Sequence, residues 1–134
     1  MVPAASRQEG GFPKRLTLGG CKTLTRTQLQ SLSYSAGWRG SDLKTAVAVA
    51  FAESGGRTCA VGDTTIQTAT WGPSTCLWQI RSIKSELGGG GVRDANANLS
   101  DPSVCAQHAF AIWKAHGWSP TWSTFLHGTF KRYL

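Results

Sequence analysis

SDLKTAVAVAFAESGG, residues 41–56, is the stretch that decides the fold, because it predicts a helix that is apolar on almost every side. Its apolar residues recur at i, i+3, i+4, i+7 and i+8, the spacing of one helical face: Leu43, Ala46, Val47, Ala50 and Phe51. The other faces carry alanine and valine as well, and such a helix belongs in the centre of a domain. Ser41 or Asp42 is expected to cap it, and Gly55-Gly56 to end it.

Further helices are expected on both sides of this stretch. Thr25 and Gln28 match a capping box, which predicts a helix that ends at Gly37. Residues 101–117 predict another, with Asp as its cap, Pro as its first residue and Gly at its end. Ser119-Pro120 starts a last short helix.

The residues after the central helix have a different character. Residues 57–76 are rich in Thr and Gly, which predicts short extended segments and turns. Residues 77–80 (LWQI) begin another short buried element, and the glycines of residues 88–91 predict a loop or hinge. The chain is therefore expected to adopt an α+β fold, mainly helical, with a central buried helix and a small β insertion.

The chain length of 134 residues fits one compact domain. Residues 1–24 are rich in Pro, Gly and basic residues and are expected to form a flexible or docking N-terminal arm, followed by the domain at residues 25–134. No run of about eighteen apolar residues exists, so no membrane partner is expected. Residues 1–15 lack the central hydrophobic run of a secretory signal peptide.

The charge is strongly positive, with 14 Lys and Arg against 7 Asp and Glu and a formal net charge of +7. Such a balance favours polyanionic surroundings, of which nucleic acid and the bacterial envelope are examples. Readers of nucleic-acid sequence usually concentrate their charge on one element, whereas the basic residues here are scattered. We therefore expect diffuse attraction to a negative surface and no specific nucleic-acid partner.

Four cysteines stand at positions 21, 59, 76 and 105, without a C-x-x-C pair, so neither a zinc site nor a redox motif is indicated. The even count permits two disulfides in three pairings. A Cys59–Cys76 bridge would close the loop between two candidate site segments. Because no signal peptide is visible, reduced and buried thiols are the default expectation.

Glu53 is the acid that stands out, because it lies in the last predicted turn of the most apolar helix. The partial negative charge of a helix C-terminus and apolar neighbours both disfavour an ionised carboxylate. Both effects raise a pKa, as a general acid acting near neutral pH requires. The alternative is an exposed Glu that is mildly unfavourable at a helix end.

Five strings of sequence decide between these alternatives: AVAVAFAESGG (46–56), GD (62–63), WGPSTCLWQI (71–80), LSDPSVCAQHAFAI (99–112) and GWSPTW (117–122). Together they resemble the lysozyme-like superfamily, in the lytic transglycosylase and goose-type lysozyme branch of actinobacteria and their phages. The resemblance covers roughly residues 25–134. It implies a lysozyme-like α+β fold and cleavage of the β-1,4 bond between N-acetylmuramic acid and N-acetylglucosamine in peptidoglycan.

The resemblance also assigns site residues. Glu53 matches the catalytic acid, and Ser74, Trp78 and Gln79 match residues of the substrate groove. Gln79 can instead be a core amide, and any single tryptophan is more readily explained by packing. Asp63 is either a second carboxylate that holds or activates water, as in some goose-type enzymes, or a turn residue.

Two positions depart from the family pattern. Cys76 stands where the family has glycine, so the loop is strained if that position needs a backbone conformation open only to glycine. Cys105-Ala106 stands where the family has Asn-Ala. The paired substitutions indicate either a disulfide between the two segments or independent core thiols.

A single strong acid favours the scheme of a lytic transglycosylase, with lysozyme-type hydrolysis as the neighbouring possibility; neither needs a cofactor or a metal. The expected partner is the peptidoglycan glycan strand, with phage tail or virion proteins as further partners of residues 1–24. The expected location is a phage virion, or the bacterial cell wall after release from the host cell. The alternative function is a non-catalytic wall-binding or structural phage tail module.

Overall fold

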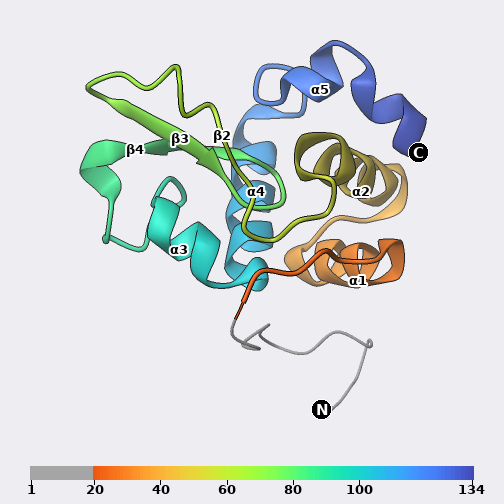
Figure 1. Cartoon of the computed structure of the whole chain (residues 1–134). Coiled ribbons are helices and arrows are strands. Elements are labelled where there is room, and N and C mark those ends of the chain that lie inside the picture. The colour runs from red at the N-terminus through yellow and green to blue at the C-terminus, as the bar shows by residue number, and fades with distance from the viewer. Residues whose placement is uncertain (1–19) are drawn as a thin grey trace.

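The computed structural model describes residues 20–134, and Figure 1 shows how the elements are arranged. In chain order the elements, with η for a 3-10 helix, are α1 (Arg26–Ala36), α2 (Gly40–Ser54), β2 (Val61–Gly62), β3 (Trp71–Thr75), β4 (Ile80–Ile83), η1 (Lys84–Glu86), α3 (Ala95–Ser100), α4 (Pro102–His116), α5 (Ser123–Leu126) and η2 (Thr129–Tyr133). The strands and α3 lie on one side of α4, and α1 and α2 lie on the other (Figure 1). The expected α+β fold, mainly helical with a small β insertion, is confirmed.

Helix α2 is the buried centre that the sequence predicts. Residues 46–50 are each at most 1% exposed. Gly55, with φ 67°, ends the helix in the left-handed conformation, as expected. The expected cap is wrong, because the helix begins at Gly40 and no side chain caps it. The Asp42 carboxylate instead accepts a hydrogen bond from Trp118 Nε1 at 3.2 Å, a contact between residues far apart in the sequence.

Helices α1 and α4 follow their capping signals closely, but α5 does not: it begins at Ser123, after a turn at residues 119–121, and not at Ser119-Pro120 as expected, and no side chain caps it. Thr25 and Gln28 form the expected capping box of α1, and Asp101 caps α4, whose first residue is Pro102. Helix α3 is not predicted by the sequence patterns; it starts after Asp94, whose carboxylate caps it. None of the helices within residues 20–134 has the length and apolar character needed to cross a bilayer.

A cluster of aromatic side chains joins α4 to the segments around it. Trp38 is fully buried, stacks on Trp118 with ring centroids 5.6 Å apart, and meets Trp78 at 5.4 Å. Trp118 contacts Trp122 at 5.2 Å. Packing is therefore the observed role of Trp78, Trp118 and Trp122, which are each at most 8% exposed. Trp71 on β3 differs, because 37% of it is exposed.

Strands β2, β3 and β4 form one antiparallel sheet in that order. Val61 pairs with Thr75, and Thr75 also pairs with Ile80 on the next strand. The register between β3 and β4 shifts between Trp71 and Ser74, so the insertion is as irregular as the sequence predicts. A turn at residues 76–79 joins β3 to β4, which runs antiparallel to it.

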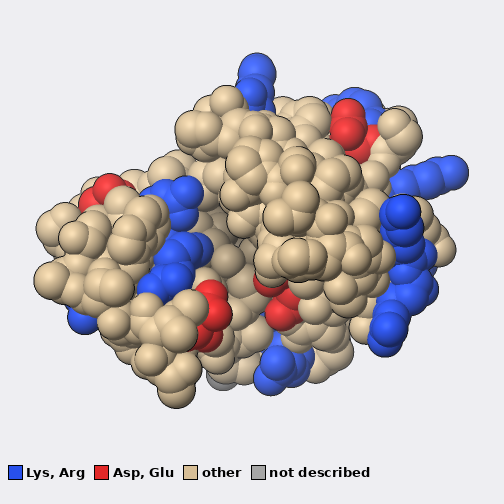
Figure 2. Space-filling model, turned by 90° about the horizontal axis from the view of Figure 1, so that it is seen from above, with Lys and Arg blue, Asp and Glu red and all other residues tan. Residues whose placement is uncertain are grey.

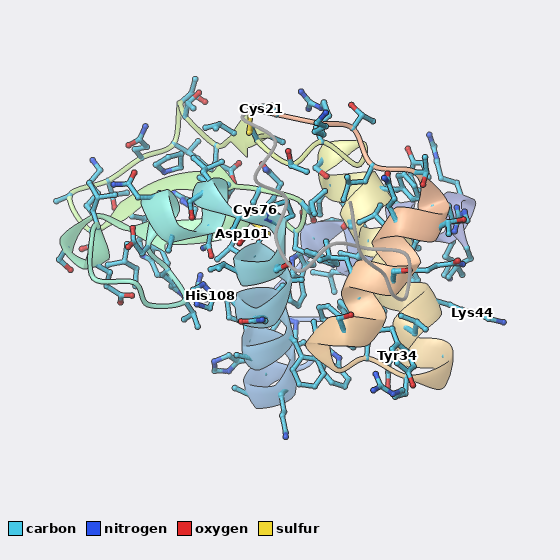
Figure 3. The ribbon with its side chains drawn as sticks, turned by 90° about the horizontal axis from the view of Figure 1, so that it is seen from below. Cys21, Tyr34, Lys44, Cys76, Asp101 and His108 are labelled. Atoms are coloured by element: carbon cyan, nitrogen blue, oxygen red, sulfur yellow. A yellow bond between two sulfur atoms is a disulfide. The ribbon has the colours of Figure 1, made fainter. Side chains whose placement is uncertain are left out.

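Both cysteine pairs are joined by disulfides, Cys21–Cys59 and Cys76–Cys105. The expectation of reduced thiols is therefore wrong, and so is the idea of a Cys59–Cys76 bridge. The paired Cα atoms are 5.3 Å and 6.4 Å apart, within the usual range for a disulfide. The alternative in which Cys76 and Cys105 join their two segments is confirmed, and Figure 3 shows Cys76 beside Asp101, where α4 begins.

The described part of the expected arm packs against the domain. Leu24 is 3% exposed, and its N–H donates to the Gly56 carbonyl at 2.9 Å. Together with the Cys21–Cys59 disulfide, this contact attaches residues 21–24 to the segment after α2. The boundary expected between residues 24 and 25 therefore passes through a packed region, and residues 1–19 lie outside the described residues.

Candidate active site

An open cleft of about 550 Å³ separates the sheet from the segment that follows α4. Side chains line it from the last turn of α2, from the strands and the turns beside them, from Arg93 before α3, from α4, and from residues 120–123. Figure 2 shows a hollow between two parts of the surface, with basic side chains along one wall and acidic side chains beside it. A concave site of this volume that combines apolar and charged groups is the form that ligand sites usually take.

Glu53 reaches this cleft from the last turn of α2, with its side chain half-buried. Its Oε2 accepts a hydrogen bond from Thr124 Oγ1 at 2.7 Å. Burial raises the pKa of Glu53 above its ordinary value of 4.5, the hydrogen bonds of Thr124 oppose that rise, and the negative charge of Asp63 adds to it. The net direction is upward, so Glu53 keeps its proton to a higher pH than a free glutamate side chain.

Asp63 and Ser74 line the same cleft as Glu53. Ser74 lies on β3 opposite Gly62, is 3% exposed, and donates a hydrogen bond from Oγ to Asp63 Oδ2. Asp63 has φ 56°, a left-handed conformation in which Asp is one of the better tolerated residues, and it turns the chain after β2. Asp63 is thus a turn residue by its backbone and a cleft residue by its side chain.

Gln79 also lines the cleft, and it fastens the strands at the same time. Its Nε2 donates to the carbonyls of Ala60 and Cys76 at 3.0 Å and 2.9 Å. The amide lies against Gly62, where a Cβ would stand 2.5 Å from Gln79 Oε1. Gln79 therefore satisfies backbone carbonyls as a core amide does, and it lines the cleft as well.

Trp78 does not reach the cleft. The side chain is 0% exposed, and its Nε1 donates to the Ala46 carbonyl of α2 at 3.0 Å. A substrate-binding role for Trp78 does not fit this burial, because the turn at residues 76–79 places its indole in the core. Gln79, in the same turn, lines the cleft. The Trp78 carbonyl instead supports Trp122, a cleft residue whose Nε1 donates to it at 2.7 Å.

Cys76 has φ 68°, so the position does use the conformation that favours glycine. The strain expected from a cysteine there is real, and it amounts to about 1 kcal/mol for a residue with a Cβ. The disulfide to Cys105 ties this turn to α4. The turn that presents Gln79 to the cleft is therefore anchored covalently to a long helix.

Sequence reasoning missed several residues at or beside the site. Thr124, the partner of Glu53, lies 71 residues away from it in the chain, and no local pattern relates the two. Trp71, Arg81 and Arg93 line the cleft. Arg81 lies on β4, but Gln79 precedes that strand and has φ 50°, so the alternation of side chains along a strand does not extend from Gln79 to Arg81.

No group of three or more His, Cys, Asp or Glu side chains within residues 20–134 is placed to hold a metal ion. The chemistry that the described site offers is that of a half-buried carboxyl group with a raised pKa, a second carboxylate, a hydroxyl, an amide and two guanidinium groups in one open cleft. These groups suit proton transfer to and from a polar ligand.

Comparison with known families gives one match. The family model described as "Lysozyme like domain" matches residues 30–124, a span that includes Glu53, Asp63, Gln79 and Thr124. Comparison with curated proteins found no match, and neither did comparison with solved structures.

Proposed function

Because this chain belongs to the lysozyme-like domain family, we propose that it cleaves the glycan strands of bacterial peptidoglycan at the β-1,4 bond between N-acetylmuramic acid and N-acetylglucosamine. The observation that carries the proposal is Glu53, a half-buried carboxyl group with a raised pKa in an open cleft. Such a group can be protonated when substrate binds and can deliver that proton to a leaving sugar oxygen.

The proposed reaction uses Glu53 twice, in the single-acid scheme of a lytic transglycosylase. The Glu53 carboxyl group first donates its proton to the glycosidic oxygen, and the bond from that oxygen to C1 of muramic acid breaks. The Glu53 carboxylate then takes the proton of the 6-hydroxyl of the same sugar, whose oxygen bonds to C1. The product carries a 1,6-anhydro ring, and Glu53 has regained its proton.

Hydrolysis of the same bond is the second candidate, and the position of Asp63 favours it. Asp63 lines the cleft with Glu53 and is held by Ser74, so it can position a water molecule for attack on C1. In that scheme the product has a reducing end instead of an anhydro ring. Both candidates require Glu53 as the proton donor.

Zymography on peptidoglycan tests the activity, and mass spectrometry of released fragments tells the two reactions apart. Wild-type protein should clear the substrate, and Glu53→Gln should not. Glu86→Gln is the control for the chemical change, because it removes a carboxylate that does not line the cleft; it should still clear the substrate, since Glu86 acts on the cleft only through its charge near Arg93. If wild-type protein fails to clear any peptidoglycan, the non-catalytic wall-binding module becomes the better explanation.

The place of action is part of the proposal. Two disulfides are typical of proteins that work in oxidising surroundings, which supports action at the cell wall, outside the cytoplasm. Transport in a phage tail or virion, through partners of residues 1–24, or release from a lysing host, is supported by the sequence resemblance alone. Detection of the protein in purified phage particles tests the first of these routes.

A further inference from the structure

The wall of the cleft formed by the strands carries two arginines beside an exposed tryptophan. Arg81 on β4 and Arg93, which precedes α3, line the cleft together with Trp71 on β3. Their guanidinium carbons lie 6.0 Å and 5.3 Å from the centre of the Trp71 ring. These distances lie within the range of cation–π contacts, so the ring helps to hold both groups in place.

The remaining contacts of the two guanidinium groups are mostly with uncharged backbone. Arg81 donates to the carbonyls of Gly72 and Ile66 at 2.5 Å and 2.7 Å, and Arg93 donates to the Arg81 carbonyl at 2.8 Å. A guanidinium group has five N–H donors, so each arginine keeps donors beyond those used in these bonds. Backbone carbonyls orient both groups but do not neutralise them.

The charge balance of the cleft favours an anion. The ionisable side chains that line it are Glu53, Asp63, Arg81, Arg93 and His116. When Glu53 is protonated, as the proposed reaction requires, two guanidinium groups face the single carboxylate of Asp63, which Ser74 already engages. Burial lowers the pKa of Arg93 because it removes water from the charged guanidinium group, and the negative charge of Glu86 opposes this shift. An anion bound beside Arg93 would also stabilise the charged form and so offset the lost hydration.

We propose that Arg93, supported by Arg81 and Trp71, forms a subsite for the carboxylates that muramic acid residues carry, so that the enzyme selects acidic peptidoglycan over uncharged β-1,4 glycans. This inference rests on the proposed function. The planar fork of a guanidinium group matches the two oxygens of a carboxylate. Such carboxylates occur on the peptide stems and, where stems have been removed, on the lactyl group of the sugar.

Steady-state kinetics on purified sacculi, before and after amidation of their carboxylates with a carbodiimide and ammonium, test the subsite. For wild-type protein, amidation should raise KM roughly tenfold and leave kcat nearly unchanged, because one charge-assisted contact is lost. Arg93→Gln should show the raised KM already on untreated sacculi and should respond little to amidation. Circular dichroism checks that this variant is folded, and Arg93→Lys should restore part of the affinity.

The matched control is Lys44→Gln, which removes an exposed cation from the start of α2, where Figure 3 shows the side chain pointing away from the body of the protein. Diffuse attraction by the net charge of +7 would make both variants lose affinity equally, whereas the subsite predicts a loss for Arg93→Gln alone. Equal losses would overturn the proposal, and so would a wild-type KM that neither amidation raises nor removal of the peptide stems lowers.

The source of the carboxylate is decided by glycan strands whose stems have been removed with an amidase. Wild-type KM should stay low on such strands if the lactyl carboxylate is bound and should rise if the stem carboxylates are bound; a KM that is low on stripped strands and on amidated sacculi alike would exclude the subsite. Failure of the proposed function looks different, because wild-type protein would then cleave none of these substrates.

Discussion

Removal of the Cys76–Cys105 disulfide should lower the free energy of unfolding by an amount that depends on the length of the loop that the bond closes. The bond joins residues 29 apart and ties the turn before Gln79 to α4. Two double variants separate the effects of the crosslink and of the backbone. Cys76→Ala with Cys105→Ala removes the crosslink and keeps a Cβ at position 76. Cys76→Gly with Cys105→Ala removes both the crosslink and that Cβ.

The magnitude follows from chain entropy and from backbone conformation. For a closed loop of 29 residues, the chain-entropy model gives a loss of roughly 3.5 kcal/mol in the free energy of unfolding at 25 °C. Alanine at φ 68° retains the strain of the left-handed conformation, which glycine relieves. The glycine variant should therefore regain roughly 0.5 to 1 kcal/mol after its larger unfolded-state entropy is counted.

Urea unfolding followed by tryptophan fluorescence and by circular dichroism measures both values. With a slope of roughly 2 kcal/mol per M, the midpoint of the alanine variant should fall by about 2 M, and that of the glycine variant by somewhat less. A loss below about 1 kcal/mol for the alanine variant would mean that the crosslink restrains the unfolded chain far less than its loop length implies. A glycine variant no more stable than the alanine variant would contradict the assignment of backbone strain to position 76.

Three further predictions concern the site. The pKa of Glu53 is raised in the folded state, so the stability that its protonated form contributes is full below its unfolded pKa and is lost as pH rises through the folded pKa. Glu53→Gln does not titrate, so urea unfolding should show it gaining stability relative to wild type towards neutral pH but not at acidic pH. Thr124→Val removes the hydrogen bond that lowers the pKa of Glu53, so the alkaline limb of the pH–activity profile should move to higher pH, and a shift to lower pH would contradict the assigned contact. Gly62→Ala places a Cβ 2.5 Å from Gln79 Oε1 and must displace that side chain, so lytic activity should fall at least roughly tenfold in a protein that circular dichroism shows to be folded; full activity would remove Gln79 from the site.

Sequence patterns located the central helix and its acid because both depend on local information. Apolar spacing predicts the buried face of α2, and a pair of glycines predicts its end next to Glu53. The same reasoning misjudged the cap, because Asp42 is engaged by Trp118, a contact that only the folded chain creates. Local signals therefore sufficed for the element and failed for a residue with a distant partner.

The site was harder to predict, because its geometry depends on the turn at residues 76–79. Cys76 and Gln79 both have positive φ, which breaks the simple alternation of side chains along an extended segment. Residues 76–79 therefore form a turn between β3 and β4, in which Trp78 is buried in the core and Gln79 lines the cleft. The cysteine pairing is a second example, because four cysteines allow three pairings and only spatial proximity selects one.

The disulfide between Cys21 and Cys59 has a mechanical consequence. A force that reached the domain at Cys21 would divide there between the chain that leads into α1 and the crosslink. Cys59 follows Glu53 by only six residues, whereas Cys21 precedes it by 32, so the covalent route through the sulfur atoms is much the shorter one to the cleft. The crosslink would therefore keep such a load from passing entirely through the first helix.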